Sequence, residues 1–104
     1  MIRVTHVRRA RKFFYIGRKW AEFEESPYHN PFHIGKDGDR PEVLLKFAIY
    51  WYAPEQKKLR DRAVQELSQL QPDGFVGCWC YPQFCHGDIV AGYVNWKLRQ
   101  ETLF

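Results

Sequence analysis

The sequence has few cysteines, no long apolar run, and no acidic residue in its first 20 positions. No apolar stretch approaches the roughly 20 residues needed to span a bilayer. The segment from Met1 to Thr5 lacks the apolar core of a signal peptide. Three cysteines cannot pair evenly, so we expect free thiols in a reducing compartment rather than a disulfide framework. Together these absences predict a cytoplasmic protein without a membrane partner.

The charge is unevenly spread along the chain. Residues 1–20 carry seven Arg or Lys, whereas residues 21–104 hold nine basic and twelve acidic groups. One end of the molecule is therefore strongly basic. This favours an anionic partner, either a phosphorylated small molecule or nucleic acid. A solubilising surface patch is the alternative interpretation.

The length of 104 residues predicts a single domain, residues 1–104, with one core. Alternation and helical spacing of apolar residues predict strands at residues 2–7, 13–16 and 75–79, and helices at residues 41–52, 55–70 and from 86–88 onward. This ββααβα order predicts a small α/β domain with about three helices on a short mixed sheet. The first two strands are expected to lie side by side or to form a hairpin, with the basic residues 8–12 at its tip.

A long irregular segment separates the second strand from the first helix. Residues 18–39 contain two prolines and several turn residues, and a loop of this length in a small domain is usually functional. Gly35 and Gly38 flank Lys36, an arrangement that would bring backbone N–H groups near an anion. We expect this loop to fold over the start of the last helix, so that Arg18 or Lys36 lies near His86.

Residues 77–88 hold all three cysteines, one histidine and one carboxylate. Cys78 and Cys80 are two apart on a predicted strand and so share one face. Cys85 and His86 fall where the last helix begins, and the helix dipole there stabilises a thiolate. Such a strand–loop–helix junction is where α/β proteins bind ligands. We therefore predict a functional site at this junction.

Three interpretations of the cysteines remain open. In the first, the cysteines line an anion or nucleotide pocket. In the second, they bind zinc, although their spacing lacks the two-residue gap usual between paired zinc-binding cysteines. In the third, they are small buried apolar residues. Cys85 with His86 as base is a possible nucleophile, but sequence neighbours rarely face each other correctly. His29 or His33 from the long loop would be better placed as the base.

Several separate blocks of this sequence resemble one family. They are Arg18 and Trp20, Ser26-Pro27, Asn30-Pro31-Phe32, Ile34-Gly35-Lys36-Asp37-Gly38, Arg40, and Gly77-Cys78-Trp79-Cys80-x-Pro82-x-x-Cys85-His86-Gly87-Asp88. This pattern resembles the uncharacterised domain-of-unknown-function family 4326, found in phages and bacteria. Its members usually read Ser-Pro-Leu-Gly-Asn-Pro-Phe, whereas this chain has Tyr28-His29 in the middle. The resemblance carries no activity, but by analogy it implies a Rossmann-like nucleotide or nucleoside pocket.

The sequence thus predicts a protein that binds a phosphorylated or nucleoside-like small molecule, and leaves open whether that molecule is also processed. The alternatives are a zinc-stabilised nucleic-acid-binding module and a phage accessory protein that sequesters a signal nucleotide. We expect no cofactor, no metal ligand, and only weak, non-specific binding of nucleic acid. The expected catalytic residues are Cys85, His86 and Asp88. The expected ligand-binding residues are Arg18, Trp20, Ser26, Asn30, Phe32, Lys36, Arg40 and Cys80.

Overall fold

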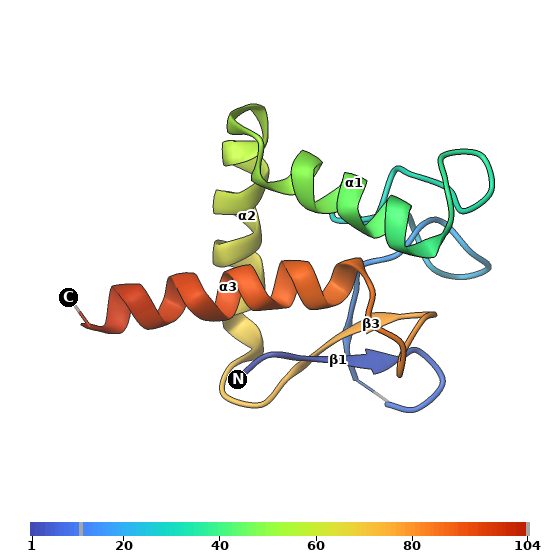
Figure 1. Ribbon diagram of the computed structural model, residues 1–104. Coiled ribbons are helices and arrows are strands. Elements are labelled where there is room, and N and C mark those ends of the chain that lie inside the picture. The colour runs from blue at the N-terminus through green and yellow to red at the C-terminus, as the bar shows by residue number, and fades with distance from the viewer. Residues whose placement is uncertain (11, 104) are drawn as a thin grey trace.

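The computed structural model describes residues 1–10 and 12–103 of the chain (Figure 1). Two short 3-10 helices, Pro54–Gln56 and Ser68–Leu70, flank the second α-helix. The remaining elements, in chain order, are β1 (Arg3–His6), β2 (Phe14–Tyr15), α1 (Arg40–Tyr52), α2 (Lys57–Leu67), β3 (Phe75–Cys78) and α3 (His86–Leu103).

The three strands form a parallel sheet in the order β1-β3-β2. Val4 of β1 pairs with Val76 of β3, and Phe14 of β2 pairs with the same residue from the other side. The central strand β3 is the most buried of the three, as its continuous apolar run predicts. The prediction of a mixed sheet is therefore wrong.

The predicted pairing of the first two strands is also wrong, because β3 lies between them. A tight hairpin needs Gly, Asn or Asp at its turn, and the connecting residues 7–13 contain none of these. Arg8 and Arg9 lie in a turn after β1, so the basic cluster is not a hairpin tip. Arg11, which we included in that cluster, lies outside the described residues.

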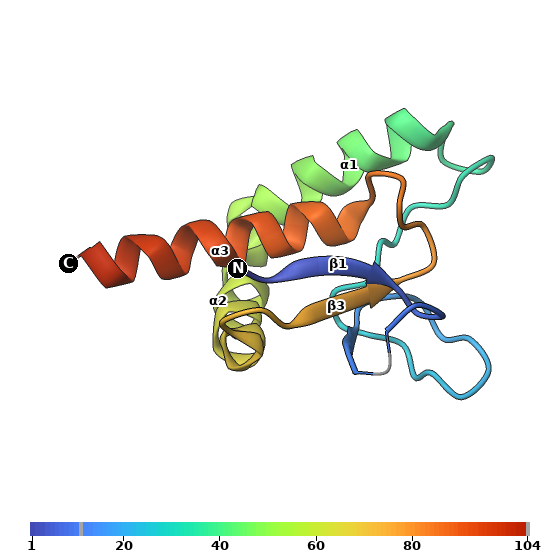
Figure 2. The same ribbon diagram turned by 90° about the horizontal axis from the view of Figure 1, so that it is seen from below.

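The helices lie on one side of the strands in the view of Figure 1, and Figure 2 shows α3 running alongside β1. Helix α3 packs on β1 and β3, and α1 and α2 pack in turn against α3. The largest fully buried side chains, Trp51, Tyr28 and Phe47, fill the space among these helices and the long loop. No helix in the described part of the chain is both long enough and apolar enough to cross a membrane.

Local signals account for the helix bounds. The side chain of Asp39 accepts a hydrogen bond from the backbone N–H of Glu42, whose own side chain returns to the Asp39 N–H, which confirms the predicted capping box. Helix α1 ends at Tyr52, just before Pro54. Ala63 and Leu67 of α2 are buried, as their spacing predicts.

Candidate functional site

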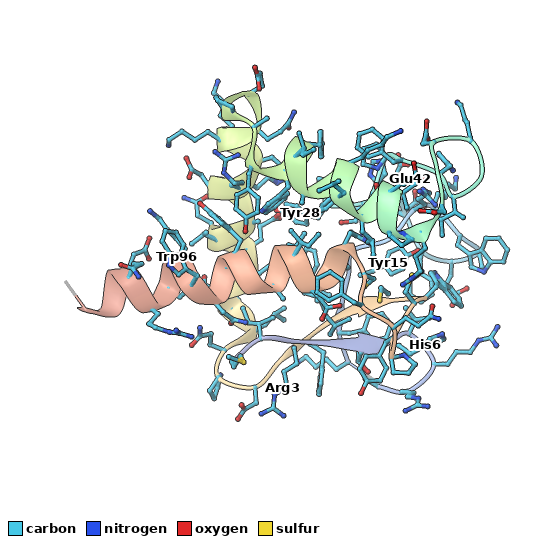
Figure 3. The ribbon with its side chains drawn as sticks, viewed as in Figure 1. Arg3, His6, Tyr15, Tyr28, Glu42 and Trp96 are labelled. Atoms are coloured by element: carbon cyan, nitrogen blue, oxygen red, sulfur yellow. The ribbon has the colours of Figure 1, made fainter. Side chains whose placement is uncertain are left out.

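A pocket of about 540 Å³ opens at the carboxyl end of the parallel sheet. His6 at the end of β1, Tyr15 at the end of β2 and Cys78 at the end of β3 all line it. Figure 3 shows His6 and Tyr15 at this end of the molecule, whereas Trp96 lies far along α3. The first turns of α1 and α3 and part of the 18–39 loop complete the walls.

Most of the predicted site residues meet in this one pocket, although they come from segments far apart in the sequence. The loop reaches the start of α3, as expected, and places Arg18 in the same pocket as His86. The predicted residues that line the pocket are Arg18, Trp20, Asn30, Phe32, Arg40, Cys80, Cys85 and His86.

Three predicted residues do not line this pocket: Ser26, Lys36 and Asp88. The Ser26 hydroxyl is buried and accepts a hydrogen bond from the Tyr28 N–H at 3.1 Å. A carboxylate oxygen of Asp88 accepts from the Cys85 N–H at 2.8 Å and so caps the start of α3. These two side chains therefore stabilise local structure instead of contributing to the pocket.

Lys36 is exposed and does not line the pocket, and the turn that contains it closes on itself. The Gly35 N–H donates to the Gly38 carbonyl at 2.8 Å, and the Asp37 carboxylate accepts from the His33 N–H at 2.8 Å. Both glycines have positive φ, +97° and +130°, which lets the chain turn so tightly. The Gly35 N–H is therefore already used within the turn, contrary to the anion-binding role suggested by the sequence.

The pocket walls carry positive charge. Arg8, Arg18, Lys19 and Arg40 line it, and no Asp or Glu does. None of these four side chains forms an ion pair with a carboxylate in the described part of the chain. The pocket therefore offers uncompensated positive charge to a ligand.

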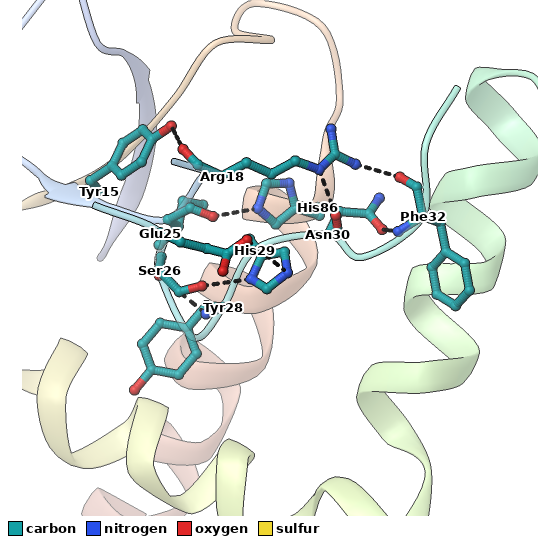
Figure 4. Close-up of polar contacts among 10 residues, drawn as sticks. Tyr15, Arg18, Glu25, Ser26, Tyr28, His29, Asn30, Phe32 and His86 are labelled. Carbon is teal, nitrogen blue, oxygen red and sulfur yellow. Dashed lines mark hydrogen bonds and ion pairs between the residues drawn. The ribbon is translucent and has the colours of Figure 1, made fainter. Parts of the chain in front are cut away.

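Arg18 fastens the loop to the pocket (Figure 4). Its Nε donates to the Asn30 carbonyl at 3.1 Å and its Nη2 to the Phe32 carbonyl at 2.5 Å. The Asn30 amide oxygen accepts from the Phe32 N–H at 2.9 Å, so this side chain holds the loop although it lies at the pocket wall. Only Nη1 of Arg18 makes no hydrogen bond within residues 1–10 and 12–103, which leaves it for a ligand.

Aromatic rings form another wall of the pocket. The indole N–H of Trp79 donates to the Tyr15 hydroxyl at 3.0 Å, and the Trp20 ring meets the Trp79 ring edge-on at 6.0 Å. The Arg8 guanidinium lies 5.6 Å from the centre of the Trp79 ring. Trp20 is 62% exposed and can present its ring face to a flat ligand.

His86 is 8% exposed and packs edge-on against Phe47, with ring centres 5.3 Å apart. Its Nε2 lies 2.7 Å from the Ile16 carbonyl oxygen. A carbonyl only accepts, so Nε2 carries the proton and Nδ1 keeps its lone pair. Burial lowers the pKa of His86, although the hydrogen bond to Ile16 opposes this shift. The neutral ring can therefore accept a hydrogen bond or a proton.

The three thiols differ in access and acidity. Cys78 and Cys85 are each 1% exposed, with their sulfurs 3.1 Å apart. Hydrogen bonds to Cys78 and Cys80, together with burial, raise the pKa of the Cys85 thiol. Hydrogen bonds from Cys78 and Cys85 lower the pKa of the half-buried Cys80, and Arg40, whose Nη1 lies 3.8 Å from its sulfur, adds to this. The geometry thus favours Cys80 as the reactive thiol, where we had expected Cys85.

The predicted partner histidines lie elsewhere. His29 faces Glu25 and the Ser26 carbonyl, and neither His29 nor His33 lines the pocket. Among the described residues, no group of three or more His, Cys, Asp or Glu side chains is arranged to hold a metal ion.

Sequence reasoning missed several pocket residues: His6, Arg8, Tyr15, Lys19 and Trp79. Most of them lie at or just after the carboxyl end of a strand. A parallel sheet brings such ends together, whereas the predicted pairing of adjacent strands does not. Because the predicted strand pairing was wrong, these pocket residues could not be predicted from the sequence.

The comparisons with known proteins concern the chain as a whole. No curated protein and no solved structure matches it. A family model described as a domain of unknown function, DUF4326, matches residues 2–96, which include every residue of the pocket. This chain therefore belongs to the domain-of-unknown-function family 4326.

Proposed function

We propose that the pocket binds an anionic small molecule that carries a flat ring, of the nucleotide or phosphorylated-nucleoside class. The observation that supports this most strongly is the concave surface with four basic side chains and no carboxylate. Uncompensated cations in a partly enclosed site attract anions and discriminate against cations. The exposed ring of Trp20 supplies a stacking surface next to that charge.

The position and size of the pocket support the same proposal. Ligands of open α/β sheets bind outside the carboxyl ends of the strands, where this pocket lies. A volume of about 540 Å³ falls within the range of small-molecule sites. The first turns of α1 and α3 also line the pocket. We therefore extend the proposal to a Rossmann-like mode of binding.

Each group has a distinct role in this proposal. Arg8, Lys19 and the unused Nη1 of Arg18 contact the phosphate, and Trp20 stacks on the ring. The lone pair on Nδ1 of His86 accepts a hydrogen bond from the ligand or takes a proton from it. Binding is the core of the proposal, and any reaction would use His86 as the base.

The test is a thermal melt of the purified protein with ligands of graded chemistry: inorganic phosphate, nucleosides, nucleoside monophosphates and nucleoside triphosphates. A bound ligand at 100 times its dissociation constant should add about 2.7 kcal/mol to the free energy of unfolding. We expect nucleotides to stabilise more than either phosphate or nucleoside alone. The proposal fails if no nucleotide shifts the melting temperature, or if a short DNA duplex binds with nanomolar affinity at physiological salt while nucleotides do not bind.

A further inference from the structure

The three cysteines form a compact group where β3 meets α3. Cys78 is the last residue of β3, and Cys85 immediately precedes α3. Their sulfurs are 3.1 Å apart in the core, and Cys80 follows Cys78 by two residues, with its sulfur 3.8 Å from Nη1 of Arg40. All three are free thiols that line the pocket, and Cys80 differs from the others in being only half-buried. One accessible thiol and a buried pair therefore line the same pocket.

We propose that Cys78, Cys80 and Cys85 form a site for oxidation by hydroperoxides, in which Cys80 reacts first and a Cys78–Cys85 disulfide is the final product. This goes beyond ligand binding and does not depend on it. The pocket admits a small peroxide to Cys80, whereas Cys78 and Cys85 are each 1% exposed. The Arg40 guanidinium beside Cys80 favours its thiolate, which is the nucleophilic form.

The first step breaks the O–O bond of the hydroperoxide. The Cys80 thiolate attacks one oxygen and becomes a sulfenic acid, while the other oxygen leaves as alkoxide or hydroxide and takes a proton from solvent. Cys78 then attacks the sulfur of this sulfenic acid, releases water and forms a Cys78–Cys80 disulfide. Two thiols are oxidised by two electrons, and one hydroperoxide is reduced to an alcohol, or to water, plus one water.

The final step is thiol–disulfide exchange. The Cys85 sulfur, 3.1 Å from that of Cys78, attacks Cys78 and releases Cys80. A thiol of low pKa is the better leaving group, so Cys80 leaves and returns to its thiolate. The proton of the buried Cys85 passes to the departing Cys80 sulfur, which is half-buried at the pocket wall and releases it to solvent. The disulfide then joins the two sulfurs that already lie closest together, and Cys80 is free again.

The experiment uses the intact, fully reduced protein treated with one equivalent of hydrogen peroxide. Remaining thiols are alkylated, and chymotrypsin, which cuts after Trp79 and Phe84, separates the three cysteines for mass spectrometry. We expect the protein to lose two hydrogens, to carry one alkyl group on Cys80, and to contain Cys78 linked to Cys85. Three alkylatable thiols after this treatment, or a final disulfide that includes Cys80, would overturn the proposal.

Two variants separate the steps. Cys80→Ser should slow the loss of thiols by more than tenfold, because only the buried pair remains. Cys85→Ser should stop the sequence at the Cys78–Cys80 disulfide, because exchange is blocked. Circular dichroism checks that each variant is folded. If a variant does not fold, the disulfide identified by mass spectrometry in the wild-type protein still tests the proposal. A Cys80→Ser protein that is oxidised as fast as wild type would contradict the role of Cys80.

Discussion

Replacing Trp51 with alanine is expected to lower the free energy of unfolding by about 3–5 kcal/mol, the usual cost of truncating a large buried aromatic side chain. Trp51 is fully buried in α1 and stacks on Phe47 with ring centres 5.9 Å apart. Its ring also meets Tyr28 and Tyr93 edge-on, at 6.4 and 5.9 Å. The substitution therefore opens a cavity where α1, α3 and the long loop meet. A loss of this size is a large share of the 5–15 kcal/mol typical of small domains.

Trp51→Phe is the matched control. Within the described residues, the buried indole Nε1 has no hydrogen-bond partner, and leaving such a group unpaired costs about 1–3 kcal/mol. Phenylalanine keeps most of the ring and removes this donor, so its net cost should be less than half that of alanine. Urea unfolding followed by circular dichroism measures both values. Equal losses of unfolding free energy for the two variants would show that the unpaired indole N–H does not destabilise the folded state.

Arg18→Ala is expected to weaken ligand binding by at least about 100-fold, because it removes a charge-assisted contact, worth about 1.5–3 kcal/mol, and also frees the loop that shapes the pocket. The guanidinium donates to two backbone carbonyls, those of Asn30 and Phe32. We therefore also expect the unliganded protein to lose about 2 kcal/mol of stability.

Arg18→Lys separates these two effects. Lysine keeps the positive charge, but its single ammonium group lacks the planar guanidinium geometry that lets arginine donate to both carbonyls at once. We expect it to recover part of the binding and little of the stability, as measured by calorimetric titration and thermal melting. If Arg18→Ala binds nucleotide as tightly as wild type, Arg18 holds the loop and does not contact the ligand.

The helices could be predicted because their signals are local. Asp39 and Glu42 define the start of α1 through their own hydrogen bonds, and Pro54 follows its end. The strand pairing could not be predicted in the same way. Strand β2 has only two residues, and its partner β3 lies about 60 residues away in sequence. No local pattern specifies that β3 inserts between β1 and β2, and this pairing decides the architecture.

The sequence motifs indicated which residues share the pocket where those residues lie close together in the chain. Cys80, Cys85 and His86 stand within a few residues of one another, and all three line the pocket. Asp88 does not line the pocket, because a carboxylate three residues after a helix cap serves the cap as readily as it serves catalysis. Lys36 does not line the pocket, and the glycines beside it did not reveal that their turn uses the Gly35 N–H internally.

The most direct test of the proposed function compares two substitutions that remove the same charge. Both lysines are exposed, but Lys19 lines the pocket and Lys36 does not. Lys19→Gln and Lys36→Gln therefore remove the same charge at the pocket and away from it. Calorimetric titration with the nucleotide that stabilises the protein most gives both affinities. We predict that Lys19→Gln weakens binding by about tenfold, a typical loss of one charged contact, and that Lys36→Gln leaves it within about twofold of wild type. Equal effects of the two variants, or a larger effect of Lys36→Gln, would contradict binding in this pocket.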